Sequence, residues 1–165
     1  QKMTKGKNDM GNFSFDRESL RQNFFTTEGR LNRKAFIMRF FGVSISLGVI
    51  AFIVYAALYN GTGSKDIADS IAISISVVEA FIVYTLIARR LHDLGYSKVL
   101  AVVYLVYGLT QTIVMNYLTD NFEPGSMPIY AYQILSTCVI IFLVCLMFMK
   151  GVKGENRFGK DPLGD

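Results

Sequence analysis

Basic and amide side chains gather in three short segments of this sequence, and together they have the chemistry of an anion-binding site. The members are Arg30, Asn32, Arg33, Arg89, Arg90, His92, Asn156 and Arg157. Guanidinium groups bind phosphate oxygens through paired N–H donors, and asparagine amides and Gly-rich backbone add further donors. Near a membrane surface such a cluster suits the phosphate of a lipid headgroup, and the same chemistry suits a soluble nucleotide. The pattern therefore predicts a site for an anionic ligand.

The same segments also have a structural interpretation. Arg90 and Asp93 are one helical turn apart, so they can form an ion pair. Asp161 offers a second acidic partner in the last segment. On this interpretation the clusters anchor the chain at the membrane, cap helices and join three distant segments by salt bridges. The residue types alone leave both interpretations open.

Glu79 lies in the middle of a long apolar run, residues 67–88. An ionised group at the centre of a membrane helix costs about 2.5 to 3.5 kcal/mol, so this carboxyl should be protonated, paired or in a wetted cavity. Tyr107 and Gln111 belong to a polar stripe on the next run, and the depth of Tyr107 predicts a hydrogen bond between Glu79 and Tyr107. Glu79 is then a neutral structural acid, a group that handles protons or cations in a conduit, or an oligomer contact.

Catalytic and metal-binding patterns are weak in this sequence. His92, Asp93 and Ser97 have the residue types of a hydrolytic triad, but side chains so close in sequence usually point in different directions. A second nitrogen or thiolate ligand for a metal is lacking beside His92. The glycine spacing in 151–159 does not fit a phosphate-binding P-loop. We therefore expect no enzyme activity, no metal and no cofactor.

Four uninterrupted apolar runs must position these side chains. They cover residues 40–59, 67–88, 99–118 and 129–149. About 20 residues of helix span the roughly 30 Å hydrocarbon core of a bilayer, so each run is long enough to cross it. Small residues recur every four positions at Ala68, Ala72, Ser76 and Ala80, which predicts a ridge for close helix packing. The sequence predicts an all-α integral membrane four-helix bundle.

Charge is distributed very unevenly along the chain. Lysine and arginine number 17 against 13 acidic residues, and a net charge of +4 with a pI near 9.1 would by itself suit a nucleic-acid binder. However, 16 of the 17 basic residues lie in residues 1–39, 89–98 and 150–165, which four crossings place on one side of the membrane. The positive-inside rule then places both termini in the cytoplasm. We expect no nucleic-acid partner.

The chain divides into four parts on these grounds. Residues 1–12 have almost nothing to bury and are expected to be a disordered end, and residues 13–39 form an amphipathic cytoplasmic arm with an interfacial helix near its start. Residues 40–149 form the four-span domain, and residues 150–165 a Gly-rich basic cytoplasmic tail.

Three residues or segments are expected to mark helix ends. Asn32 should be an N-cap, Gly95 a C-terminal cap, and the segment 60–66 a turn.

Three ordered motifs carry a family resemblance. They are G-R-x-N-R at 29–33, R-R-L-H-D-x-G at 89–95 and G-x-N-R-F-G-x-D-P at 154–162. Together they resemble the small bacterial inner-membrane proteins grouped as domain of unknown function 805. The resemblance implies four membrane helices and no established activity. Family members usually continue after the second motif with Ser-Gly and Trp, whereas here Ser97 is followed by Lys98 and Val99 and the chain has no tryptophan.

These observations predict a multi-pass protein of the bacterial inner membrane with a non-catalytic role. It would be a scaffold or interaction protein whose basic cytoplasmic face binds anionic lipid headgroups or a partner, and that partner could be a second copy or another membrane protein. The alternative is a small transporter or channel component that uses Glu79.

Overall fold

The structure, a computed structural model, describes residues 17–164. Its helices are α1 (Arg17–Phe24), α2 (Arg33–Thr62), α3 (Lys65–Asp93), α4 (Val99–Asn121) and α5 (Met127–Phe148). No strand occurs within the described residues, so the expected all-α class is confirmed. The expected disordered end, residues 1–12, lies outside the described residues, as do the first four residues of the arm.

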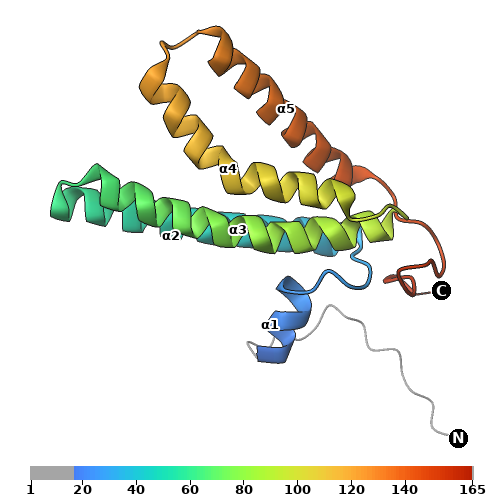
Figure 1. The fold of residues 1–165 in the computed structure, drawn as a ribbon. Helices are drawn as coiled ribbons and strands as arrows, with labels where there is room; N and C mark the ends of the chain where they lie inside the picture. The colour runs from blue at the N-terminus through green and yellow to red at the C-terminus, as the bar shows by residue number, and fades with distance from the viewer. Residues whose placement is uncertain (1–16, 165) are drawn as a thin grey trace, which may run out of the picture.

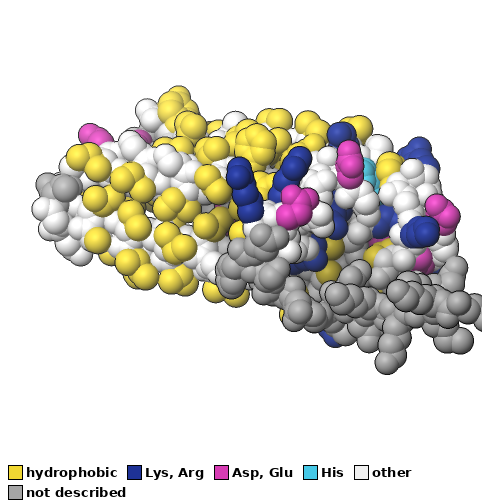
Figure 2. All heavy atoms as spheres, turned by 90° about the horizontal axis from the view of Figure 1, so that it is seen from below, with side chains coloured by type: hydrophobic (Ala, Val, Ile, Leu, Met, Phe, Trp, Pro, Cys, Tyr) yellow, Lys and Arg dark blue, Asp and Glu magenta, His cyan; other side chains and the backbone are white. Residues whose placement is uncertain are grey.

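Helices α2 to α5 are each long and apolar enough to cross a membrane. Their apolar side chains point largely outward, and none of the residues in the most apolar stretch of α2 is buried. Figure 2 shows these apolar side chains over much of the face in view, with charged side chains gathered mainly toward one end. Such a surface needs hydrocarbon as its solvent, so the chain is a multi-pass membrane protein.

Both expected helix caps are present. Asn32 precedes α2, and its side-chain oxygen accepts a hydrogen bond from the Ala35 N–H at 2.9 Å. At the end of α3, Gly95 has φ of 82°, and the Gly95 and Tyr96 N–H groups bond back to the carbonyls of His92 and Leu91. This pair of bonds is the Schellman motif, which requires a left-handed residue and so favours glycine.

The connection between α2 and α3 is shorter than expected. The sequence suggested a turn over 60–66, but α2 continues through Thr62 and α3 begins at Lys65. Gly63, with φ of 67°, reverses the chain and donates its N–H to the Tyr59 carbonyl. One left-handed residue is sufficient for this reversal, so Asn60 and Gly61 remain in the last helical turn.

α3 is the central helix of the molecule. It packs along α2 on one side and along α4 on the other, while α5 makes fewer contacts with the other helices. Gly108 of α4 lies so close to Ala80 that an added Cβ would stand 2.9 Å from the Ala80 Cβ. Four residues earlier on α3, the hydroxyls of Ser76 and Thr112 are 3.4 Å apart. The predicted small-residue ridge is thus confirmed at Ala80 and Ser76.

α4 and α5 form a hairpin that leaves the α2–α3 pair. Figure 1 shows α4 running beside α3 at first and then turning away together with α5. Within α4 the Thr110 hydroxyl donates to the Val106 carbonyl at 2.9 Å, an interaction of a type that bends helices. The α2–α3 pair and the α4–α5 hairpin therefore diverge toward the far end of the molecule, where the α2–α3 and α4–α5 turns lie (Figure 1).

The buried core lies at the opposite end. It combines the C-terminal half of α3 with residues just before and at the start of α2 and residues at the end of α5; its members include Leu31, Phe36, Val83, Leu86, Ile87, Leu91 and Leu146. We call this end, built from residues 17–34, 89–98 and 149–164, the polar end.

Candidate functional site

A buried junction of two arginines and one aspartate lies at the centre of the polar end. Arg30 donates from both Nε and Nη2 to Asp93 Oδ1, each at 3.1 Å. Arg90 donates from Nη1 to the other carboxylate oxygen, Asp93 Oδ2. Arg90 is 0% exposed and Asp93 3%. The carboxylate thus joins the first sequence motif to the second, and it confirms the predicted pairing of Arg90 with Asp93.

The same two guanidinium groups hold the tail through its backbone. Arg30 donates to the carbonyls of Val152, Gly154 and Gly159. Arg90 donates to the carbonyl of Leu146, at 2.9 Å, and to that of Met149. Carbonyl oxygens at the end of α5 and in the following irregular segment need donors, and the arginines supply them.

Backbone hydrogen bonds complete the joint between arm, loop and tail. The Leu31 N–H donates to the Arg89 carbonyl at 3.1 Å, and the Val152 N–H donates to the Asp93 carbonyl at 2.9 Å. An added Cβ on Gly151 would clash with the Asp93 carboxylate, so only glycine lets the tail approach this closely. Glycine is therefore required at position 151 for steric reasons.

The third motif closes over His92. The rings of His92 and Phe158 stack with centroids 3.9 Å apart, and the Arg157 guanidinium carbon lies 4.6 Å from the Phe158 ring centroid. Asn156 donates from Nδ2 to the His92 carbonyl at 3.0 Å. His92 Nδ1 lies 3.2 Å from the Gly29 carbonyl. One histidine thus contacts both the arm and the tail.

Asp161 pairs with the backbone of the tail. Its carboxylate accepts hydrogen bonds from the N–H groups of Leu163 and Gly154, each at 3.0 Å. The Leu163 bond, the Gly154 bond and the positive charge of Arg30 hold the pKa of this carboxyl below its ordinary value, against the opposite effect of desolvation. Asp161 is therefore ionised at neutral pH and shapes the loop that Arg30 binds.

Arg89 holds α1 against α3. Its Nη1 donates to the carbonyls of Gln22 and Asn23, at 2.9 and 3.3 Å, which lie in the last turn of α1. The Thr85 hydroxyl donates to the Phe24 carbonyl at 2.6 Å. A cation at a helix C-terminus is favourable because it meets the negative end of the helix dipole.

The residues predicted to bind an anion thus divide into two groups. Arg30 and Arg90 are buried and donate to the protein itself, whereas Arg33 and Arg157 are exposed. Asn32 caps α2, and the side chains of His92 and Asn156 bond the arm and the loop. Phe158 was not singled out as a site residue, although it stands inside the third motif, and the steric role of Gly151 beside Asp93 was not predicted. No spacing rule could have linked them to residues about 60 positions away.

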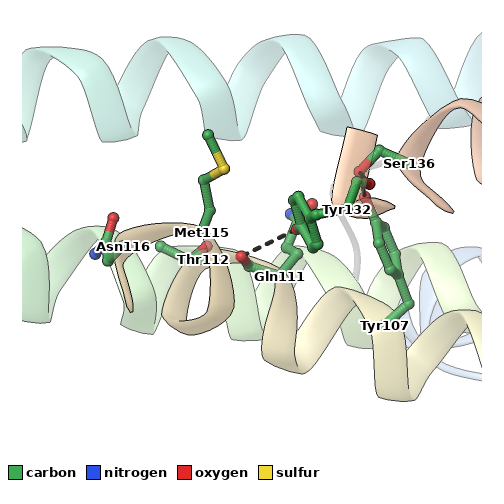
Figure 3. A pocket seen from close by; sticks show the side chains of 7 residues that line it. All are labelled: Tyr107, Gln111, Thr112, Met115, Asn116, Tyr132 and Ser136. Carbon is green, nitrogen blue, oxygen red and sulfur yellow. Dashed lines mark hydrogen bonds between the residues drawn. The ribbon is translucent and has the colours of Figure 1, made fainter. Parts of the chain in front are cut away.

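The polar residues predicted within the membrane, Glu79, Tyr107 and Gln111, lie outside the polar end. The expected hydrogen bond between Glu79 and Tyr107 is not formed, because the Tyr107 hydroxyl donates to Ser136 Oγ of α5 at 3.1 Å. Tyr107 and Gln111 instead line a pocket of about 380 Å³ between α4 and α5, drawn in Figure 3. Glu79 is half-buried and is not part of that lining.

Comparison with family models places these motifs in a known group. Residues 24–160 match the family described as protein of unknown function (DUF805), and the match includes the first two motifs and most of the third. Comparison with curated proteins and comparison with solved structures give no match. Because the matched residues make up most of the chain, the protein belongs to the DUF805 family.

Proposed function

We propose that this protein is a non-catalytic scaffold of the bacterial inner membrane, with its polar end in the cytoplasm. Exposed basic side chains at that end bind anionic lipid headgroups. The Arg30–Asp93–Arg90 junction has a different task, which is to hold arm, loop and tail together as one surface.

The observation that carries this proposal is the distribution of exposed charge. At the polar end the exposed basic residues are Arg17, Arg21, Arg33, Lys34, Lys98, Lys150, Lys153, Arg157 and Lys160. The exposed acidic residues described there are only Glu18, Glu28 and Glu155. Basic residues near an anionic leaflet contribute about 1 kcal/mol each, so this excess favours contact with headgroups.

The far end has the opposite character. Lys65 is the one basic residue among 60–70 and 119–127, and it lies 3.9 Å from Asp120 in an exposed ion pair. Asp66 and Glu123 are exposed there as well. This asymmetry supports a cytoplasmic polar end by the positive-inside rule.

Native mass spectrometry of the detergent-extracted protein tests the proposal. The variant Arg33→Gln, Lys34→Gln, Lys98→Gln, Lys150→Gln removes exposed charge and leaves the buried junction intact. We expect phosphatidylglycerol retained by the protein to fall at least about tenfold relative to phosphatidylethanolamine. The control Lys65→Gln should retain wild-type amounts. Equal retention by the fourfold variant and the wild type would refute headgroup binding.

The alternative of a transporter that uses Glu79 has no specific support in the geometry. The side chains that line the pocket between α4 and α5 do not include Glu79. A conduit through this acid therefore stays a prediction.

A further inference from the structure

The pocket between α4 and α5 has an unusual lining for a membrane interior. Four lining side chains carry a hydroxyl and two carry a carboxamide, and Met115 is the remaining one. The lining residues are Tyr107, Gln111, Thr112, Met115, Asn116, Tyr132 and Ser136. Figure 3 shows them along one side of α4 and on the facing part of α5. None of them is charged.

Several of the hydroxyl groups already have partners in the protein. Tyr107 donates to Ser136, Ser136 donates to the Tyr132 carbonyl at 2.9 Å, and Tyr132 donates to the Gln111 carbonyl at 3.1 Å. The Thr112 hydroxyl lies 3.4 Å from that of Ser76. The Tyr107 and Tyr132 bonds join α4 to α5 and position the walls of the pocket, while the Thr112 contact joins α4 to α3.

Unlike these hydroxyl groups, the two carboxamides of the lining lack hydrogen-bond partners among the described residues. Within the described part of the chain, the side chains of Gln111 and Asn116 make no hydrogen bond to the protein, although both are half-buried. Gln111 lies about 18 Å along α4 from its first residue and about 15 Å from its last, near the middle of the membrane. Lipid tails cannot satisfy the Gln111 amide at that depth, and a polar group that lacks a hydrogen bond in hydrocarbon is costly.

The geometry points to a binding site for a neutral amphiphile whose hydroxyl or carbonyl group pairs with the carboxamides of Gln111 and Asn116. A carboxamide both donates and accepts, so it suits either group. A charged ligand is disfavoured because the lining offers no counter-charge in a medium of low dielectric constant.

The size and the position of the pocket limit the ligand further. A volume of about 380 Å³ is at the small end of the range for ligand sites, so it holds a polar group and not a whole lipid. The apolar part of the ligand would remain among the lipid tails. Both a diacylglycerol and an isoprenoid alcohol have this chemistry. The site is remote from the polar end, so it does not depend on headgroup binding there.

Photolabelling in reconstituted vesicles tests this site. The probe is a diazirine-bearing dioctanoylglycerol, and labelled peptides are mapped by mass spectrometry. We expect labelling of α4 around residues 107–116, and competition by unlabelled dioctanoylglycerol, by farnesol, or by both. Competition by one alone would identify the source of the ligand. Dioctanoyl phosphatidate, which is charged, should not compete.

A pair of matched variants separates the site from general lipid contact. Gln111→Leu with Asn116→Leu removes both carboxamides, while the Tyr132 bond survives because it uses the Gln111 backbone. We expect labelling of this variant to fall about tenfold. Gln133→Leu with Asn121→Leu makes the same chemical changes at exposed positions outside the pocket and should label like the wild type. Equal labelling of both double variants would overturn the proposal.

The competition experiment uses the wild type, so it tests the site even if the variant Gln111→Leu with Asn116→Leu does not fold. Labelling that no neutral competitor reduces, or that phosphatidate reduces equally, would also overturn it.

Discussion

At the scale of single residues, Asp93 is the most constrained side chain of the polar end. It is the only carboxylate that either buried guanidinium group contacts among the described residues, and it contacts both. Burying three charged groups has a large desolvation cost, which good geometry and further hydrogen bonds can offset. Here the tail carbonyls provide those further bonds. The removal of one charge should therefore destabilise the fold much more than the replacement of all three charged residues by apolar ones.

The substitution Asp93→Asn tests this dependence. It leaves Arg30 and Arg90 buried without a counter-charge, so we expect a loss of about 3 to 5 kcal/mol in the free energy of unfolding. Denaturant titration in mild detergent measures the change. Asp120→Asn makes the same chemical change in the exposed pair with Lys65 and should alter stability by less than about 1 kcal/mol. Similar losses in the two variants would show that the junction does not stabilise the fold.

Single-residue predictions from the sequence succeeded where the partner was local. The pairing of Arg90 with Asp93 follows from their spacing, and so does the cap at Asn32. The bond of Arg30 to Asp93 spans 63 positions, and its donation to tail carbonyls involves backbone, which residue types do not reveal. The prediction of a bond between Glu79 and Tyr107 was wrong, because helix packing decides which neighbour the Tyr107 side chain of α4 meets.

At the scale of helices, α3 organises the molecule through small residues. In lipid the hydrophobic effect does not drive helices together, so close packing and interhelical hydrogen bonds decide which helices associate. The contact of Gly108 with Ala80, next to the Ser76 and Thr112 hydroxyls, brings α4 close to α3.

A cross-link measures this approach. With Cys138→Ser and Cys145→Ser as background, Ser76→Cys and Thr112→Cys should form a disulfide on oxidation, because the hydroxyl oxygens that the two sulfur atoms would replace lie 3.4 Å apart. Adding Gly108→Leu should push α4 away and abolish most of the cross-link. Gly48→Leu lies on α2 with no atom near the added side chain and should leave it unchanged. A cross-link that persists in the Gly108→Leu variant would contradict the packing.

Helix existence was predictable, whereas helix arrangement was not. Apolar run length and caps predicted four of the helices, because both are local properties of the chain. The hairpin of α4 and α5 that leaves α3, and the pocket it creates, depend on which faces pack in lipid. Hydropathy carries little information on that choice.

At the scale of the whole molecule, the two ends differ in packing and in charge. The polar end is tightly packed and basic, whereas the far end is less packed and acidic. The polar end contains the buried junction and most of the exposed basic residues, and the core lies beside it. The family motifs all lie at this end, so they are explained as parts of one joint between arm, loop and tail. The proposed function requires this joint to face the cytoplasm.

Cysteine accessibility in spheroplasts tests that requirement most directly. In a background of Cys138→Ser and Cys145→Ser, Ser97→Cys marks the polar end and Gly61→Cys the far end, and both positions are exposed. A membrane-impermeant maleimide should label the far-end site in intact spheroplasts and the polar-end site only after lysis. Labelling of the polar-end site in intact spheroplasts, or of the far-end site only after lysis, would contradict a cytoplasmic polar end.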